Sequence, residues 1–286
     1  MPEPLLVDLS LARRIEGALA ADLVAFARAR AALDPQSGAA HLALAGGVAV
    51  WTGQFGSRGQ GLGLDGPVTG ADLARVAAFL TAPGRGDGGP AEIELCPLAA
   101  EALAGALERR PHRLGGFRNV YAAAVPVPAP APAAIQPPGL TIEAAAGERL
   151  ADWSRVLLDG FGYSTGERRT RVARWNDMMG TVPEATLLLA VLRGEPVGAS
   201  SVLVHDLPGG SRVASLGGTT TLVPHRRQGV QLALLRHRLN LAARAGCDLA
   251  VVTADPGSSS GRNARRAGFA LAYTNARVRL AEVRPT

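Results

Sequence analysis

The six residues from Arg226 to Gln231 combine the chemical groups that hold a phosphate in a protein. They follow the β-branched strand end Thr219–Val223 and lead directly into an apolar, helix-forming run. The start of a helix leaves backbone N–H groups without partners and carries the positive end of the helix dipole. Gly229 lets the backbone approach a ligand closely, and Arg226 and Arg227 add positive charge beside it. These residues therefore predict a binding site for a phosphorylated ligand.

The residues after this helix extend the pattern. Cys247–Thr253 is a short apolar run bounded by glycine and proline, which is typical of a buried strand. The hydroxyl-rich turn Pro256–Ser260 can cap a helix. We expect that helix at Arg262–Ala267, which carries Asn263 and is stopped by Gly268-Phe269. The predicted order is strand, phosphate-binding turn and helix, strand, and short Asn-bearing helix.

This segment resembles the coenzyme-binding half of the GCN5-related N-acetyltransferases, the GNAT family. The family pattern is Arg/Gln-x-x-Gly-x-Gly/Ala after a strand, and this chain has Arg226-x-x-Gly229-x-Gln231, so its last position departs from the common form. The resemblance covers Leu140 to about Leu280 and implies acetyl-coenzyme A as co-substrate. In the family the pantetheine arm pairs with the exposed strand end, much like an added strand. The coenzyme-binding residues that the resemblance implies are Thr220, Thr221, Leu222, Arg226, Arg227, Gln228, Gly229, Val230, Gln231 and Asn263.

The resemblance does not identify the catalytic acid and base. Many relatives have a tyrosine four residues before the Gly-Phe pair, where this chain has Ala264. A carboxylate often lies on the strand before the phosphate-binding turn, yet Val213–Thr221 contains no acidic residue. The catalytic residues are therefore unknown from the sequence. The remaining candidates, which no spacing argument supports, are Tyr163, His205, Asp206 and Tyr273.

Composition limits the other classes of protein. The 286 residues carry a net charge of +6 and no lysine, so all 30 basic side chains are arginine. That charge suits an anionic cofactor better than nucleic acid, because no nucleic-acid-binding motif is present. Cys96 and Cys247 have no Cys or His at metal-ligand spacing, so we expect no metal. Without a signal peptide or an apolar stretch near 20 residues, we expect a cytoplasmic protein that has no contact with a membrane.

Alternating Pro and Ala between residues 126 and 139 separate two halves of the chain. Residues 1–125 repeat the pattern of strands and helices without the Arg-x-x-Gly turn, so they resemble a degenerate, non-catalytic GNAT domain. Residues 140–286 would form the domain that binds acetyl-coenzyme A. The resemblance implies an α/β (α+β) fold in two domains, each a mixed, mostly antiparallel sheet flanked by helices. Within the second domain, Gly160–Ser164 joins two helices and would face the acceptor.

A second glycine-rich segment is a competing nucleotide motif. Gly61-x-Gly63-x-x-Gly66 matches the dinucleotide fingerprint Gly-x-Gly-x-x-Gly. That fingerprint counts only where it joins a strand directly to a helix, and here Pro67–Gly70 come between the two. We therefore predict a flexible connecting loop at residues 61–66 in preference to a nucleotide site.

Two functions remain open at this stage, and a third is weaker. The first is an acetyl-coenzyme A-dependent N-acetyltransferase that moves the acetyl group to a primary amine, by direct attack in a ternary complex. Its acceptor would be a small molecule that the sequence does not identify. The alternative is a non-catalytic protein that binds acetyl-coenzyme A as a sensor or structural element, which the missing acid and base favour. Nucleic-acid binding by the arginines has the least support.

Overall fold

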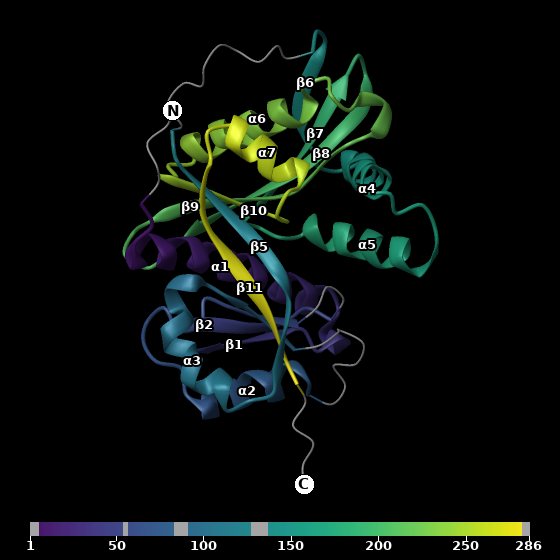
Figure 1. The fold of residues 1–286 in the computed structure, drawn as a ribbon. Helices are drawn as coiled ribbons and strands as arrows, with labels where there is room; N and C mark the ends of the chain where they lie inside the picture. Colours follow the sequence, from purple (N-terminus) through teal and green to yellow (C-terminus); the bar gives the residue numbers. More distant parts are fainter. Residues whose placement is uncertain (1–5, 54–56, 83–90, 127–136, 282–286) are drawn as a thin grey trace. The chain divides into compact units, whose positions relative to one another are not determined.

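A computed structural model of the chain describes residues 6–53, 57–82, 91–126 and 137–281. Contacts between residues divide the chain into two compact units. The C-terminal unit contains Tyr121–Thr253 and Gly257–Ala270. The N-terminal unit contains the described residues from 6 to 120, Ala254–Pro256 and the described residues from Leu271 onward. Figure 1 labels most of the helices and strands of both units.

The C-terminal unit has a six-stranded sheet in the order β5-β10-β9-β8-β7-β6. β6, β7, β8 and β9 pair antiparallel in series, and β9 then pairs parallel with β10. Its elements are β6 (Leu140–Ala144), α4 (Arg149–Gly160), α5 (Gly166–Met179), β7 (Ala185–Leu192), β8 (Glu195–Asp206), β9 (Arg212–Thr221), η3 (Val223–His225), α6 (Val230–Arg244), β10 (Leu249–Ala254) and α7 (Ser259–Arg266), with the last residues of β5 (His112–Ala124).

Helices α4 and α6 cover the middle of this sheet (Figure 1). Val230 and Leu234 of α6 pack into a buried cluster with apolar side chains of β7 and β8. Trp153 of α4 is fully buried, and its indole N–H donates to the carbonyl of Ser200 in β8 at 2.9 Å. Burying a large aromatic side chain and satisfying its polar group together fix how α4 lies on the sheet.

Strands β9 and β10 part within the C-terminal unit. Their parallel pairing runs from Val213–Leu249 to Ser215–Val251, although β9 continues to Thr221. Among the described residues, none of β9 after Ser215 pairs with β10. The last residues of β9 therefore present backbone N–H and C=O groups on that side without a neighbouring strand, which is the arrangement that an extended ligand can use.

The strands of the N-terminal unit lie in the order β1-β2-β3-β4-β11-β5. Their pairing is also mixed, because β1, β2 and β3 pair antiparallel, β3 and β4 pair parallel, and β4 and β11 pair antiparallel. Its elements are α1 (Leu9–Leu33), η1 (Pro35–Ser37), β1 (Ala40–Leu44), β2 (Gly47–Trp51), β3 (Ser57–Gln60), α2 (Gly70–Leu80), β4 (Glu92–Leu95), η2 (Pro97–Ala99), α3 (Ala100–Glu108), most of β5, and β11 (Ala270–Leu280).

The final strand belongs to the sheet of the N-terminal unit. β11 follows α7 in the chain, yet its residues Ala276–Arg279 pair with Glu92–Leu95 of β4. The predicted domain boundaries, with residues 140–286 as one domain, stay a prediction, and most of the 126–139 segment lies outside the described residues. The structure nevertheless shows that the N-terminal sheet is built from both ends of the chain.

One local expectation differs from the structure. Residues 61–66 are a packed connection and not an open loop: Leu62 and Leu64 are buried, and the N–H of Gly63 donates to the carbonyl of Ala45 at 2.9 Å. A Cβ added at Gly63 would lie 2.4 Å from Leu103 Cδ1, so the backbone there is pressed against α3.

A buried carboxylate lies at the centre of the N-terminal unit. Glu16 of α1 is fully buried and accepts hydrogen bonds from Tyr273 Oη (2.9 Å) and Asn275 Nδ2 (2.9 Å), both in β11, and from Gln60 Nε2 (2.5 Å) in β3. Burial raises the pKa of the Glu16 carboxyl above 4.5, and the three hydrogen bonds oppose that rise. One acid therefore ties the final strand to the helix that begins the fold.

The raised pKa of Glu16 predicts how stability changes with pH. The folded protein holds this proton more tightly than the unfolded chain, so its stabilisation is present at low pH and is lost as the pH rises through the folded pKa. Glu16→Gln cannot ionise and keeps an oxygen for Tyr273 and Asn275. We expect the free energy of unfolding of Glu16→Gln minus that of the wild type to increase from pH 5 to pH 8, measured by urea denaturation. A difference that stays the same from pH 5 to pH 8 would contradict this.

Candidate functional site

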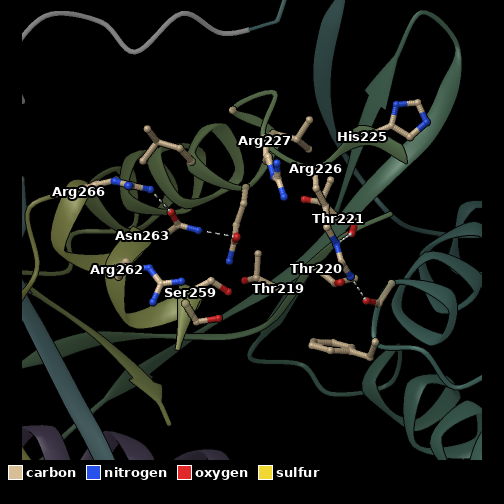
Figure 2. A pocket seen from close by; sticks show the side chains of 17 residues that line it. Thr219, Thr220, Thr221, His225, Arg226, Arg227, Ser259, Arg262, Asn263 and Arg266 are labelled. Atoms are coloured by element: carbon tan, nitrogen blue, oxygen red, sulfur yellow. Dashed lines mark hydrogen bonds between the residues drawn. The ribbon is translucent and has the colours of Figure 1, made fainter. Parts of the chain in front are cut away.

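A cavity of about 700 Å³ opens in the C-terminal unit, next to the end of β9, which pairs with β8 on one side but not with β10 on the other. It lies between β9, the start of α6, the start of α7 and the end of α4 (Figure 2). The structure brings together all but two of the residues predicted to bind a coenzyme, and their role in binding stays a prediction. Those that line the cavity are Thr220, Thr221, Arg226, Arg227, Gly229, Val230, Gln231 and Asn263.

Leu222 and Gln228 do not line the cavity. The strand has ended at Leu222, whose N–H donates to the carbonyl of Val197 at 2.9 Å and so is not available to a ligand. The side-chain amide of Gln228 donates to the carbonyl of Pro224 at 3.2 Å and closes the turn. Thr219, one residue earlier on β9, lines the cavity instead of Leu222. The part of β9 that lines the cavity is thus Thr219–Thr221, one residue earlier in the chain than the predicted Thr220–Leu222.

The N-terminus of α6 is open to the cavity. Gly229 occupies the N-cap position with φ +86°, and no side chain caps the helix there. The first backbone N–H groups of an α-helix have no acceptor within the helix, so an uncapped start favours an anion. Arg227 also has a positive φ, +63°, which is uncommon outside glycine and is typical of strained turns at binding sites. The turn therefore has the backbone geometry of a phosphate-binding site.

The two arginines of the turn have different roles. Arg226 Nε donates to the carbonyl of Thr221 at 3.1 Å, and its Nη2 donates to the carbonyl of Gly160 at 2.8 Å, so this side chain links the end of β9 to the end of α4 (Figure 2). Arg227 forms no such bond among the described residues. Arg226 is therefore held by backbone carbonyls whereas Arg227 is not, and the contact of either arginine with phosphate stays a prediction.

A buried arginine shapes the strand beside the cavity. Between its pairs with Ala199 and Ser201 of β8, β9 carries one extra residue, which makes a β-bulge. Arg238 of α6 is only 2% exposed, and its Nη1 donates at 3.1 Å each to the carbonyls of Ser201 and Gly217, the cross-strand pair next to the bulge. Burial lowers the pKa of Arg238 to about 9, which leaves it charged at neutral pH. Arg238 thus satisfies carbonyl groups that the irregular ladder leaves in the interior.

The cavity also has residues that the coenzyme prediction did not include. Gly160 and Phe161 belong to the segment expected to face an acceptor, and a Cβ at Gly160 would lie 2.5 Å from Thr220 Oγ1, so α4 ends tightly against β9. Arg265 of α7 does not line the cavity, and its guanidinium lies over the Tyr121 ring, 6.0 Å from the ring centre. The hydroxyl-rich turn before α7 was the available signal for part of this set. The additional lining residues are Gly160, Phe161, Thr219, His225, Leu232, Ser259, Ser260, Arg262 and Arg266.

None of the candidate catalytic residues lines the cavity. Tyr273 lies in the N-terminal unit and donates to Glu16, and Asp206 forms an ion pair with Arg212 at 2.6 Å. His205 is buried in β8, and the ring of Tyr163 lies beneath Arg168. Within the described residues, no group of three or more His, Cys, Asp or Glu side chains is arranged to hold a metal ion. The same ranges contain no helix long and apolar enough to cross a membrane.

Comparisons with known proteins connect this geometry to a family of folds. No family profile and no curated protein sequence matches the chain. Among solved structures, a GCN5-related N-acetyltransferase from Kribbella flavida is 19% identical with a TM-score of 0.59, covering 91% of this chain and 96% of its own. One from Sphaerobacter thermophilus is 20% identical, with a TM-score of 0.56 over 84% and 77% of the two chains. A tandem GNAT protein from the clavulanic acid biosynthesis pathway is 18% identical, with a TM-score of 0.55 over 84% and 80%.

These likenesses extend over most of the chain and confirm the predicted fold class. Both units have a mixed, mostly antiparallel sheet, and the chain has the tandem GNAT fold. At these identities the comparison shows the fold. The activity must be argued from the cavity itself.

The bonds of Arg226 predict a difference in stability between the two neighbouring arginines. Arg226→Met leaves the carbonyls of Thr221 and Gly160 without their charged donor, and we expect a loss of about 1–2 kcal/mol in the free energy of unfolding. Arg227→Met, which removes the same charge one residue away, should change it by less than about 0.5 kcal/mol. Chemical denaturation of both variants measures this. Equal effects would show that Arg226 does not hold the turn to α4.

Proposed function

We propose that the chain is an acetyl-coenzyme A-dependent N-acetyltransferase, with its site in the C-terminal unit. The observation that carries this is the uncapped start of α6 at Gly229, which opens onto the same cavity as the unpaired end of β9. A phosphate seat next to an exposed strand edge suits a ligand with a pyrophosphate at one end and an amide-bearing arm at the other. The tandem GNAT fold supports this choice of ligand.

The residues of the cavity fit such a ligand. The backbone N–H groups after Gly229 would hold the pyrophosphate, with Arg227 adding charge. The backbone of Thr219–Thr221 would pair with the pantetheine arm as a neighbouring strand does. Arg226, by joining β9 to α4, would keep this edge of the cavity in place. Leu222 and Gln228 would support the turn without touching the ligand.

Acetyl-coenzyme A, when bound, supplies an acetyl thioester for attack by an amine. The protein must hold the amine close to that carbon in a ternary complex, and such placement alone lowers a barrier by about 7–11 kcal/mol in favourable cases. The new C–N bond forms as the C–S bond breaks, and the proton lost by the amine goes to the released thiolate. His225 is the one imidazole among the described residues that line the cavity.

The acceptor would be a primary amine of a small molecule that enters next to Phe161. Phe161 lines the cavity and is 51% exposed, so it offers an apolar surface at the end of α4. We assign residues 140–286 to acetyl transfer and residues 1–125 to a non-catalytic role, joined by the 126–139 segment. In the N-terminal unit, the N–H of Gly63 is already bonded to Ala45 and β3 stays paired with β4 through Gln60–Glu94, which supports this division.

One observation favours the alternative, a protein that binds acetyl-coenzyme A as a sensor without transferring the acetyl group. Among the described residues that line the cavity, none is an aspartate, glutamate, cysteine or tyrosine. Apart from His225, an acid that protonates the leaving thiolate would then have to come from the acceptor or from water. The two functions share the same binding site and differ only in turnover.

Binding and turnover separate the two functions. We expect the full-length protein to bind coenzyme A in isothermal titration calorimetry and to release thiol from acetyl-coenzyme A when a panel of primary amines is added. Thiol release that requires an amine supports the transferase. Binding without amine-dependent release by any member of a broad panel supports the sensor, and absence of binding contradicts both.

Gly229 tests the position of the phosphate seat. Because φ at Gly229 is +86°, a β-branched residue would strain the backbone by about 1–2 kcal/mol, whereas Asn tolerates this conformation. We expect Gly229→Asn to keep its melting temperature within a few degrees and to weaken coenzyme binding at least tenfold, about 1.4 kcal/mol. Gly229→Val should lose both stability and affinity. A folded Gly229→Asn variant with wild-type affinity would place the phosphates elsewhere.

A further inference from the structure

A short chain of hydrogen bonds links α7 to α6 along one wall of the cavity. Arg266 Nη1 donates to Asn263 Oδ1 at 3.2 Å, and Asn263 Nδ2 donates to Gln231 Oε1 at 2.6 Å. Figure 2 shows Asn263 in the middle of this chain with both bonds drawn. All three side chains line the cavity. The GNAT family, which this chain resembles, has glycine or alanine at the motif position of Gln231. The Gln231 side chain is therefore an addition to the common pattern.

The direction of this chain follows from donor and acceptor chemistry. A guanidinium has only N–H donors, so Arg266 requires Asn263 to present its amide oxygen. The amide nitrogen of Asn263 must then face Gln231, which can receive it only with its own amide oxygen. The side-chain NH₂ of Gln231 is left over, and it has no hydrogen-bond partner among the described residues. The Arg266 guanidinium thus determines that the NH₂ group of Gln231, and not its oxygen, faces the cavity.

We propose that Gln231 is a ligand-contacting residue whose NH₂ group, oriented by Asn263 and Arg266, donates to a phosphate oxygen of the bound coenzyme. This inference rests on the proposed function, and it gives Asn263 and Arg266 the role of positioning residues. A phosphate oxygen is the fitting acceptor because the uncapped start of α6 and Arg262 line the same cavity. Hydrogen bonds to charged groups are about twice as strong as neutral ones, so the orientation of one amide has a measurable effect.

The sharpest test is to reverse the direction of the hydrogen bond between Asn263 and Gln231. Asn263→Asp accepts from Arg266 but has no N–H to give, so the Gln231 amide must turn, donate to the new carboxylate and present its oxygen to the phosphate. Asn263→Ala leaves the Gln231 amide free to donate. We expect Asn263→Asp to bind coenzyme A at least tenfold more weakly than Asn263→Ala, measured by calorimetry on the full-length protein with melting temperatures for each variant.

A rescue separates amide orientation from the charge of the new carboxylate. With Gln231→Ala added, Asn263→Asp no longer has an amide to reverse, and we expect the double variant to bind within threefold of Gln231→Ala alone. If the carboxylate repelled the phosphate directly, the double variant would stay as weak as Asn263→Asp. That result, or equal affinities of Asn263→Asp and Asn263→Ala, would overturn the proposal.

A pair of arginine variants tests the origin of the orientation without a new charge in the cavity. Arg266→Met removes the cation that sets the chain, and we expect coenzyme A to bind at least threefold more weakly. Arg265→Met, the matched control on the same helix, removes the same charge and should leave affinity unchanged. Equal affinities of the two variants would overturn the role of Arg266.

If the wild type fails to bind coenzyme A, the proposed function is wrong, and the same variants titrated with inorganic pyrophosphate decide the inference. Failure to bind either probe overturns both.

Discussion

The parting of β9 from β10 after Ser215 and Val251 is the constraint on which the site depends. If the two parallel strands stayed paired, the end of β9 would have no free edge beside the cavity. The bulge opposite Ala199 and Ser201 bends β9 at this point, and buried Arg238 satisfies the carbonyl groups beside it. Arg226 then ties the strand end to α4. The separation of β9 from β10 therefore depends on the packed interior as well as on the turn from Arg226 to Gln231.

The N-terminal unit shows the same order of elements with this space closed. β3 and β4 remain paired as far as Gln60 and Glu94, and α2 follows β3 as α6 follows β9. The backbone N–H of Gly63 bonds to Ala45, and a Cβ at that glycine would meet Leu103 at 2.4 Å. Tight packing leaves no room for a ligand in such a connection. In this unit the buried carboxylate of Glu16 in α1 accepts hydrogen bonds from Tyr273 and Asn275 of β11.

Local patterns were enough to predict most of the elements and most of the cavity. Periodicity placed the helices, and the turn from Arg226 to Gln231 with Asn263 placed the site, because all these signals are carried by neighbouring residues. Long-range contacts were not readable in this way. Nothing in the run after Gly268 tells that β11 pairs with β4, and Arg238 looks like any polar helix residue until the bulge it contacts is known. For the same reason, the sequence does not predict the bonds of Arg226 to the carbonyls of Thr221 and Gly160.

A crystal structure of the full-length protein with acetyl-coenzyme A bound would show whether the coenzyme occupies this site. We expect the pyrophosphate against the backbone N–H groups that follow Gly229, and the pantetheine arm along Thr219–Thr221 between β9 and β10. The acetyl group should then lie in the cavity on the side of Phe161. Coenzyme bound in the N-terminal unit, or bound with the start of α6 unoccupied, would contradict this expectation.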